Sequence, residues 1–384
     1  MKTNRMCAII GNIEKFDALM PLIEKRPLAT LPFDCKYRLI DFQLSSLVNA
    51  NIDRLFMVFN EGETQSVFDH IGGGKEWDLD SLKNRFFTYF YQDFVKKKNE
   101  RKPFYSSLID YLQKSKSEYT VFMSSRMLCN LDLRAILKIH QAQGNDVTVV
   151  YKRVNKESVC SEDTLLDINE EGSVTGAHVL KDASAEAERV NLSMEAYIVQ
   201  TEWLIQTLEW AQENDASPSL IDLMKSQLGQ AKCSTYEYIG YLKNIHDIQS
   251  YYQANMDMLD PQKFNALMYS NQKIYTKFKN EVPTYYSPDS MVKNSQFATG
   301  CVVQGTVENS LVSRRTKIDV GAVVKHSLIN ASAKIASGAQ IEYAILDKGV
   351  VVDSGVQIKG TPDKLAVIRK GAHVTENVVG GEAE

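Results

Sequence analysis

Lys36 and Arg38 place two cationic side chains two positions apart. Side chains with this spacing point to the same face of an extended strand, so an extended segment here presents an ammonium and a guanidinium together. Such a pair binds phosphate or carboxylate groups through charge-assisted hydrogen bonds. The alternative is a pair of ordinary surface or interdomain salt bridges. These two residues are therefore candidates for binding a small anion.

The other residues that could do chemistry are scattered along the chain. Gly72-Gly73-Gly74 lacks the spacing of a phosphate-binding P-loop, which indicates an ordinary loop. His326 and His373 lie in or near a C-terminal repeat, and exposed structural roles are the simpler interpretation for both. The basic run 96–102 lacks interleaved aromatic residues, which predicts a solvated loop or a face for an acidic partner. The six cysteines include no CxxC pair, which predicts free thiols.

The composition is typical of a globular protein. The 384 residues are 44% hydrophobic and 24% charged, with a net charge of −4. That length exceeds one ordinary domain and predicts two. The charge builds no field for nucleic acid, and no run reaches the roughly 18 apolar residues that span a bilayer. We therefore expect no nucleic acid and no membrane as partner, and a cytoplasmic protein.

The first two-thirds of the chain alternates short β-branched runs with helical patterns. This alternation is typical of βαβ units and predicts an α/β domain with a mainly parallel sheet over residues 1–258. Thr201 is expected to cap the helix that follows the last strand. Three prolines interrupt a less regular stretch, which predicts a connection over 259–288. Expected strands are 7–10, 55–59, 119–123, 147–151 and 196–199, and expected helices are 42–49, 131–141, 201–212 and 246–258.

The C-terminal part of the chain contains a repeat of the form apolar-x-x-Gly-x-x-apolar. Its copies begin at Ile318, Ile335, Val352 and Ile368, so the first three are 17 residues apart and the fourth follows after 16. The same 17-residue period relates Leu311, Leu328 and Ile345. Apolar residues at intervals of six, with glycine at the corners, predict a parallel β-helix of triangular section over 289–384. A β-sandwich explains the alternation but not the fixed period.

Residues 31–45 read L-P-F-D-C-K-Y-R-L-I-D-F-Q-L-S. This segment closely resembles the P-F-G-G-K-[YF]-R-I-I-D-F-x-L-S stretch of bacterial glucose-1-phosphate adenylyltransferases, and the likeness extends over essentially the whole chain. The resemblance implies a Rossmann-like, GT-A-like nucleotidyltransferase domain with a mixed, mainly parallel sheet, followed by a left-handed parallel β-helix. It also implies the family's reaction, in which ATP and glucose 1-phosphate give ADP-glucose and diphosphate for glycogen biosynthesis.

Two ligand-binding segments of that family are altered here. The family's G-G-x-G-T-R-L loop, whose backbone amides hold the nucleotide phosphates, corresponds to residues 11–17, where Gly11 remains and Lys15 supplies a nearby cation. The G-T-A-D-A loop is missing near residues 100–104. Lys181 is a counterpart of the sugar-phosphate lysine in the family's E-K-P motif, but its neighbours differ. We therefore expect a vestigial phosphate loop and a vestigial sugar-phosphate site.

Both magnesium ligands of the family are also absent. Alignment through residues 118–123 places Arg126 at the Asp of the G-D-H motif, and Tyr238 stands at the Asp of a D-V-G-T-L segment. Magnesium needs carboxylate and phosphate oxygens, and a permanently charged guanidinium repels it. A phenol stays neutral near pH 7. With these carboxylates lost, we expect no catalytic residue, no bound metal and no cofactor.

These departures resemble the non-catalytic, D-type subunit that accompanies a catalytic subunit in Gram-positive bacteria. The resemblance implies a regulatory partner of a catalytic homologue in a heterotetramer, with magnesium bound by that homologue. In the family, the lysine that matches Lys36 helps to bind anionic effectors such as sugar phosphates. One alternative is an active adenylyltransferase whose metal site uses Asp34 or Asp132. Another is an acyltransferase that uses His326 or His373.

Overall fold

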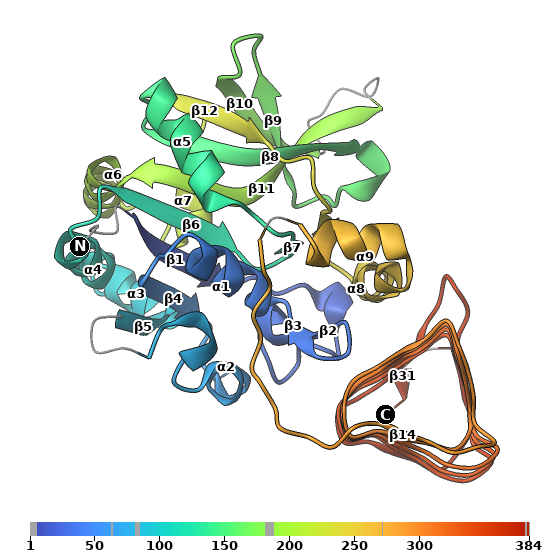
Figure 1. The fold of residues 1–384 in the computed structure, drawn as a ribbon. Helices are drawn as coiled ribbons and strands as arrows, with labels where there is room; N and C mark the ends of the chain where they lie inside the picture. Colours follow the sequence, from blue (N-terminus) through green and yellow to red (C-terminus); the bar gives the residue numbers. More distant parts are fainter. Residues whose placement is uncertain are drawn as a thin grey trace.

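An α/β unit and a triangular prism of short strands follow one another along the chain (Figure 1). The computed structural model describes residues 6–62, 64–80, 85–180, 188–270, 272–380 and 382–383. Within these segments, no helix combines the length and the apolar character that crossing a lipid bilayer requires.

One twisted sheet forms the centre of the α/β unit. Its strand order is β10-β9-β11-β6-β1-β4-β5, and β8 lies between β11 and β12. β6, β1, β4 and β5 run parallel to one another, while β11 is antiparallel to both β6 and β8. The mixed sheet matches the predicted fold. The strands are β1 (Met6–Asn12), β4 (Arg54–Phe59), β5 (Arg85–Phe90), β6 (Tyr119–Ser124), β8 (Val147–Asn155), β9 (Thr164–Ile168), β10 (Val174–Val179), β11 (Arg189–Gln200) and β12 (Cys233–Glu237).

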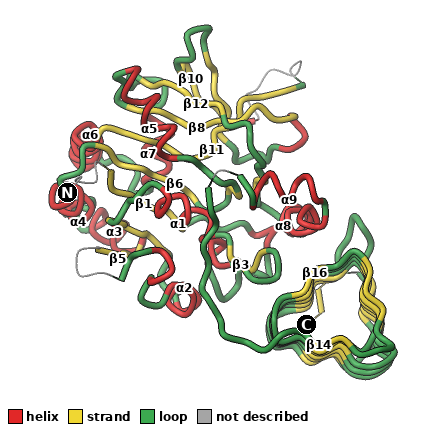
Figure 2. Tube along the Cα trace, in the orientation of Figure 1, coloured by secondary structure: helices red, strands yellow, loops and turns green. Residues whose placement is uncertain are grey.

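Helices cover both faces of this sheet (Figure 2). Alternate residues of β1 enter different cores, because Ala8 and Ile10 pack on one face while Cys7 and Ile9 pack on the other. A strand buried on both faces reads as an apolar run, which is why its position was predictable. The helices are α1 (Ile40–Asn49), α2 (Gln65–Ile71), α3 (Tyr91–Asn99), α4 (Ser106–Ser115), α5 (Leu133–Gln143), α6 (Thr201–Glu213), α7 (Leu220–Gln227), α8 (Ile248–Met256) and α9 (Pro261–Met268).

Two local predictions are wrong. The N-cap of α6 is Gln200, not Thr201, and the Thr201 hydroxyl instead lies 2.9 Å from that of Thr120 in the sheet. Helix α9 occupies part of the stretch predicted as an irregular connection. Pro261 stands in the first turn of α9, and the Asp260 carboxylate accepts hydrogen bonds from two free amides, so both residues start this helix rather than interrupt one. Residues 272–284 then run without helix or strand to the prism.

Three six-stranded parallel sheets form the sides of the prism. Ile318, Ile335 and Val352 stack on one another in one sheet, and Val324, Ile341 and Ile358 stack in the next, so the predicted 17-residue period is confirmed. The first sheet is β14 (Tyr285–Tyr286), β17 (Val302–Val303), β20 (Lys317–Ile318), β23 (Lys334–Ile335), β26 (Val351–Val352) and β29 (His373–Val374). The second is β15 (Met291–Lys293), β18 (Thr306–Glu308), β21 (Val323–Lys325), β24 (Gln340–Glu342), β27 (Gln357–Lys359) and β30 (Val378–Val379). The third is β16 (Gln296–Phe297), β19 (Leu311–Val312), β22 (Leu328–Ile329), β25 (Ala344–Leu346), β28 (Ala366–Ile368) and β31 (Glu382–Ala383).

The fourth copy of the repeat was assigned to the wrong side of the prism. Ile368 pairs with Leu346 in the third sheet, whereas the partner of Val352 is Val374. The motif that starts at Ile368 therefore turns a different corner from the first three copies. Residues 360–365 add a loop to this coil and shift the spacing, while a glycine with positive φ, Gly371, still follows at the next corner.

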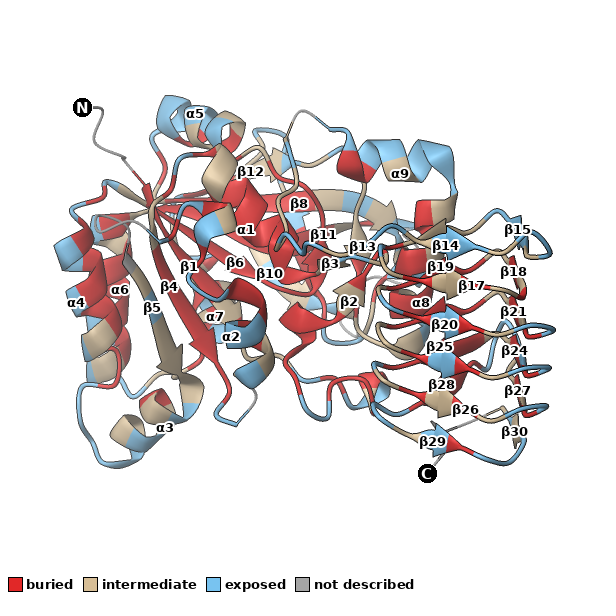
Figure 3. Ribbon diagram, turned by 60° about the horizontal axis from the view of Figure 1, so that its bottom comes forward, coloured by how far each residue is buried: buried red, intermediate tan, exposed pale blue. Residues whose placement is uncertain are grey.

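The prism packs against the α/β unit through a shared apolar core (Figure 3). Leu311, Leu328 and Ile345 point outward from the third sheet into this core. They are partners in successive coils, so they recur with the same 17-residue period as the inward residues. Arg26 of the α/β unit forms a buried ion pair with Asp347 of the prism. A hairpin of β2 (Pro32–Phe33) and β3 (Tyr37–Arg38) belongs to the same contact region.

Candidate functional site: a buried arginine network

The ends of β1 and β6 lie side by side, since Gly11 of β1 pairs with Ser124 of β6. The Ser125 hydroxyl donates a hydrogen bond to the Asn12 side-chain oxygen, which ties the two following loops together. Ligands of α/β sheets bind beyond the carboxyl ends of the strands, so this edge is the expected reaction site. Arg126 and Glu14 both emerge there.

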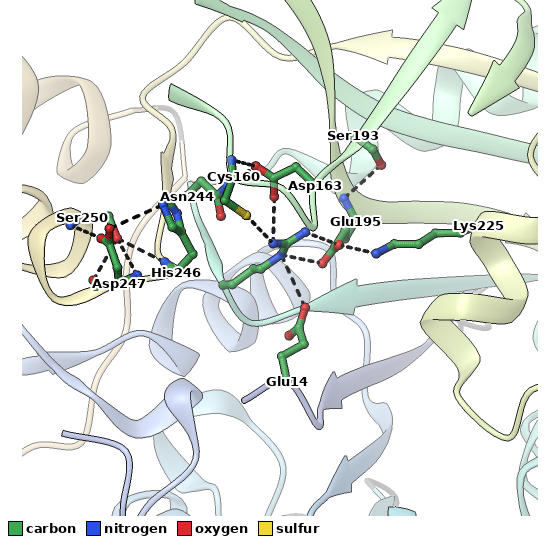
Figure 4. Close-up of polar contacts among 11 residues, drawn as sticks. Glu14, Cys160, Asp163, Ser193, Glu195, Lys225, Asn244, His246, Asp247 and Ser250 are labelled. Atoms are coloured by element: carbon green, nitrogen blue, oxygen red, sulfur yellow. Dashed lines mark hydrogen bonds and ion pairs between the residues drawn. The ribbon is translucent and has the colours of Figure 1, made fainter. Parts of the chain in front are cut away.

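The Arg126 guanidinium lies within 3.5 Å of three carboxyl groups. Figure 4 labels the residues that supply them, Glu14, Asp163 and Glu195. Its Nε and Nη2 donate to the two oxygens of Glu195 at 3.0 and 2.5 Å. Nη1 lies 2.7 Å from Asp163 Oδ1, and Nε lies 3.5 Å from Glu14 Oε1. The residue is 2% exposed, and both Glu195 and Asp163 are fully buried. The geometry is that of a bidentate, desolvated ion pair with two further acids around it.

Elements that are far apart in sequence position these acids. Glu195 lies where the register of β11 shifts against β8, and its φ of 49° is the left-handed conformation that favours glycine. Such a bulge aims a side chain away from its regular direction. Asn244 holds the second oxygen of Asp163 at 2.7 Å. Lys225 of α7 reaches Glu195 at 3.1 Å.

The pKa values of the group follow from burial and mutual charge. Burial raises the pKa of Glu14 well above its ordinary value, and the neighbouring Glu195 carboxylate raises it further. Burial also acts to raise the pKa of Glu195, but the charges of Arg126 and Lys225 outweigh this and hold it well below the usual range. Because the two pKa values shift in opposite directions, a proton held by this pair of acids binds to Glu14 rather than to Glu195.

The raised pKa of Glu14 favours its neutral form, and with Glu14 neutral the charges of the group balance. Arg126 and Lys225 supply two positive charges, while Glu195 and Asp163 supply two negative ones. No carboxylate of this group is left over for a cation. Within the described segments, no cluster of three or more His, Cys, Asp or Glu side chains is arranged to hold a metal ion. The network is therefore a closed ion cluster at the edge of the sheet where a reaction site is expected.

Tyr238 lies outside this network. It follows β12, and its hydroxyl lies 3.3 Å from the backbone nitrogen and oxygen of Asn130. The Lys152 ammonium is 5.5 Å from the centre of its ring. Burial raises the pKa of Tyr238, so the phenol stays neutral. The structure thus places Arg126 and Tyr238 in separate sets of contacts.

The residues of the predicted phosphate loop do not form a cradle of amides. Gly11 lies within β1, and a Cβ there would meet the Phe122 ring at 3.2 Å, so packing accounts for the glycine. Lys15 is exposed on the following loop. Beneath that loop, a small, largely apolar cavity of ≈ 20 Å³ lies between Ile13, Tyr91 and their neighbours. Lys181, the predicted sugar-phosphate residue, lies outside the described residues.

Lys36 and Arg38 have different contacts in the hairpin. Lys36 is exposed, with its ammonium 4.8 Å from the centre of the Tyr37 ring. The Arg38 guanidinium is partly buried and donates to the Ser66 carbonyl at 2.8 Å. Lys36 follows the turn of the hairpin rather than an extended strand, so the predicted extended geometry holds only from residue 37 onward.

The carboxylates proposed for a rebuilt metal site have other roles. Asp132 caps α5 and accepts from the amides of Arg134 and Ala135. Asp34 occupies the hairpin turn with a φ of 44°, and its amide donates to Asn255 at 3.0 Å. Burial raises the pKa of Asp34 to about 7. Neither residue contacts Arg126 in the part of the chain that the structure describes.

Sequence reasoning found Arg126 but missed its partners. Glu195, Asp163 and Lys225 come from a strand, a loop and a helix, and no local pattern connects them. The one available signal was physical, because a permanently charged residue that follows a buried strand needs acidic neighbours.

Comparisons with known proteins agree with this architecture. The family model described as nucleotidyl transferase matches residues 17–260, and the one described as GlmU-like, C-terminal hexapeptide matches residues 282–380. The second match and the three parallel sheets confirm the predicted left-handed β-helix.

Three relatives from two organisms are similar to most of the chain. The glycogen biosynthesis protein GlgD of Geobacillus stearothermophilus is 36% identical over 371 residues, with 96% of this chain and 97% of the relative covered. GlgD of Bacillus subtilis (strain 168) is 30% identical, with 84% and 83% covered. The glucose-1-phosphate adenylyltransferase of G. stearothermophilus is 31% identical, with 76% of each chain covered. The chain belongs to the nucleotidyltransferase family that contains these GlgD glycogen biosynthesis proteins and glucose-1-phosphate adenylyltransferases.

Proposed function

We propose that this chain is a catalytically inactive, regulatory subunit that assembles with a catalytic glucose-1-phosphate adenylyltransferase in glycogen biosynthesis. The observation that carries the proposal is the closed ion cluster around Arg126. It lies at the ends of β1 and β6, where the family resemblance puts a magnesium ligand.

The cluster accounts for a loss of catalysis in physical terms. Transfer of a nucleotidyl group between phosphates needs magnesium to bind the phosphate oxygens and to neutralise the charge that develops on the leaving group. Here the carboxylates at this edge already neutralise a guanidinium and an ammonium. A divalent cation would have to displace Arg126 from three short contacts and leave its charge buried. We therefore assign magnesium binding to the catalytic partner.

The runner-up, an active adenylyltransferase with a rebuilt metal site, has less support. Asp132 caps a helix, and Asp34 lies in a hairpin turn against Asn255. Oxygens that already cap a helix or lie in a buried turn are poorly placed to gather a hydrated ion together. The acyltransferase alternative also has less support. His326 stacks on Tyr343, and His373 pairs with Asp353 at 2.7 Å on the outside of the prism, so each histidine already has a structural contact.

A group of cations supports the binding of an anionic sugar-phosphate effector between the two units. Burial lowers the pKa of Lys279, and the charges of Arg314, Arg38 and Lys348 lower it further. Glu281 offsets part of this charge by pairing with Arg314 at 3.3 Å. Cations held close enough to lower the pKa of a neighbouring lysine gain from an added phosphate. We place the effector at Arg38 and Lys279, with Lys36 on the exposed side of the same hairpin.

Reconstitution tests the proposal. The purified chain is mixed with a catalytic glucose-1-phosphate adenylyltransferase of the same family, co-elution is measured, and ADP-glucose formation is followed with and without glucose 6-phosphate or inorganic phosphate. We expect a complex whose rate or effector response differs from that of the catalytic subunit alone. Absence of a complex, or a complex with unchanged rate and response, contradicts the regulatory role.

Paired variants separate the effector site from assembly. Arg38→Gln with Lys279→Gln removes two of the gathered cations and is expected to abolish the effector response while the complex still forms. Lys334→Gln, which removes an exposed lysine of the prism, is the matched control and is expected to leave the response unchanged. An effector response that survives the first variant shows that the site lies elsewhere.

A further inference from the structure

A groove with a volume of ≈ 920 Å³ lies between the prism and the helices α8 and α9. Figure 1 shows these helices on the side of the α/β unit that faces the prism. Hydrogen bonds connect the two walls of the groove. The Tyr252 hydroxyl of α8 donates to the backbone oxygen of His326 at 2.7 Å, and the Gln249 side chain donates to that of Pro362 at 2.9 Å. The two walls are therefore tied to each other.

One corner of the prism forms the first wall. Its residues directly follow the strands β15, β18, β21 and β24 in successive coils and have φ values of 42° to 48°: Asn294, Asn309, His326 and Tyr343. This left-handed conformation suits asparagine and is tolerated by histidine, but it is unfavourable for a bulky tyrosine. A tyrosine kept at such a position indicates a role for its side chain.

The Tyr343 ring belongs to a flat stack. Its centre lies 4.7 Å from that of His326, and the two planes differ by 6°. The residue that follows the next strand, β27, is Gly360, which brings no ring onto the other face of Tyr343. A side chain is excluded there, because a Cβ on Gly360 would lie 2.3 Å from the Tyr343 carbonyl oxygen. Both rings are partly exposed and line the groove, so they offer it a flat apolar surface.

Uncharged polar groups lie beside these rings. Gln262 of α9 belongs to the opposite wall and is exposed. Within the described residues, the His326 imidazole, the Tyr343 hydroxyl and the Gln262 side-chain amide form no hydrogen bond with the protein. Each of these groups can both donate and accept. A ligand that carries hydroxyl groups, which also do both, would therefore satisfy them.

The charge of the groove argues against other classes of ligand. Among the described residues that line it there is no lysine or arginine, and its one acid, Asp260, caps α9 by accepting from two backbone amides. A phosphate compound or a nucleic acid needs cations. A purely apolar ligand would bury the amides without partners. A neutral compound with an apolar face and a rim of hydroxyl groups matches both the rings and the amides.

We infer that this groove binds a neutral oligosaccharide. The C–H face of one sugar ring packs on Tyr343, while its hydroxyl groups hydrogen-bond to His326 and Gln262. The class of ligand follows from the groove, whereas the choice of α-linked glucose as the sugar unit rests on the proposed function in glycogen biosynthesis. Maltoheptaose and glycogen are therefore the probes.

Isothermal titration calorimetry of the isolated full chain with maltoheptaose measures the dissociation constant, which we expect to lie below about 1 mM. Tyr343→Asn removes the ring and introduces the residue type that Asn309 has at the same corner, so it is expected to raise this constant at least about fivefold. Gln262→Ala removes one amide from an exposed position and is also expected to raise it. Tyr269→Asn, at a 75% exposed tyrosine outside the lining, is the matched control.

Maltoheptaose and glycogen as separate titrants distinguish a short free chain from the chain ends of a polymer. Binding of either one that Tyr343→Asn and Gln262→Ala weaken, with Tyr269→Asn unchanged, supports the inference. Unaltered circular dichroism spectra show that the variants keep the fold. Binding of neither probe, or binding that Tyr343→Asn and Gln262→Ala leave intact, overturns it.

A protein ligand is the competing occupant of the groove. If neither sugar binds and Tyr343→Asn abolishes assembly with a catalytic relative, the groove is a protein contact and the inference is wrong. The titrations contain no catalytic partner and measure no ADP-glucose. A failure to bind sugar is therefore distinct from a failure of the regulatory role, which the reconstitution measures.

Discussion

Replacing Arg126 by methionine tests whether the ion cluster is a closed structural unit. The change keeps most of the side-chain volume and removes the guanidinium from Glu195 and Asp163, which are fully buried. Removing one partner of a buried ion pair typically costs about 3–5 kcal/mol, because the other charge stays buried without compensation. Three contacts of 2.5 to 3.0 Å are lost here, so we expect a cost within that range.

The cost should depend on pH with a definite sign. In the wild type, the pKa of Glu195 in the folded protein is held below the ordinary value of a glutamate. Its ion pair therefore contributes full stability at pH above the ordinary pKa, and this contribution is lost as pH falls through the folded pKa. In the variant, Glu195 is a buried charge without the guanidinium, and its protonation removes that charge. The difference between the proteins is therefore largest near neutral pH and shrinks toward pH 4.5, the ordinary value for a glutamate.

Urea denaturation followed by circular dichroism at neutral and acidic pH measures both effects. Arg134→Met, the same substitution at an exposed arginine of α5, is the control and should shift stability by no more than about 0.5 kcal/mol. The double variant Arg126→Met with Glu195→Gln should recover part of the loss, since it removes one of the stranded charges. A loss below about 1 kcal/mol for Arg126→Met at neutral pH refutes the buried network.

Further predictions concern single carboxyl groups. Glu14→Gln should disturb stability near pH 7 less than Glu195→Gln, because the raised pKa of Glu14 favours its neutral form. Glu195→Gln should destabilise by about 1–3 kcal/mol, because it weakens the Arg126 pair. Equal effects in urea denaturation would contradict the charge assignment. Asp34 has a folded pKa of about 7 against an ordinary 3.8, so its ionisation removes stability as pH rises between these values. Asn tolerates its positive φ, and Asp34→Asn should stabilise the protein by up to about 4 kcal/mol above pH 7 but little near pH 4. Thermal melts at the two pH values check this, and a gain that does not depend on pH would contradict it.

The parts of the fold that were predictable from sequence are those with a local period. The strand at β1 is an apolar run between polar residues, and the β-helix repeats every 17 residues, so both appear in a short window. The fourth repeat was misplaced because the same motif fits two different corners of the prism. Spacing specifies that a corner occurs, but only strand pairing specifies which one.

The candidate site was predictable only in part, for the same reason. Arg126 follows a recognisable strand, so alignment could locate it. Glu195 depends on a bulge in β11, and Lys225 depends on how α7 packs, and these are consequences of tertiary structure. At the hairpin, a local pattern was expected that the structure does not have. The alternation of side chains fails at Lys36, because the preceding turn residues Asp34 and Cys35 adopt positive φ values.

We propose that this chain lacks catalysis of its own because Arg126 and its acids fill the edge of the sheet where the family resemblance places magnesium. The most direct test measures diphosphate release by the isolated chain with ATP, glucose 1-phosphate and magnesium. We predict release no faster than in the absence of protein, whereas a catalytic relative in the same assay turns over. Magnesium-dependent turnover by the isolated chain, which Arg126→Met abolishes, would contradict the account.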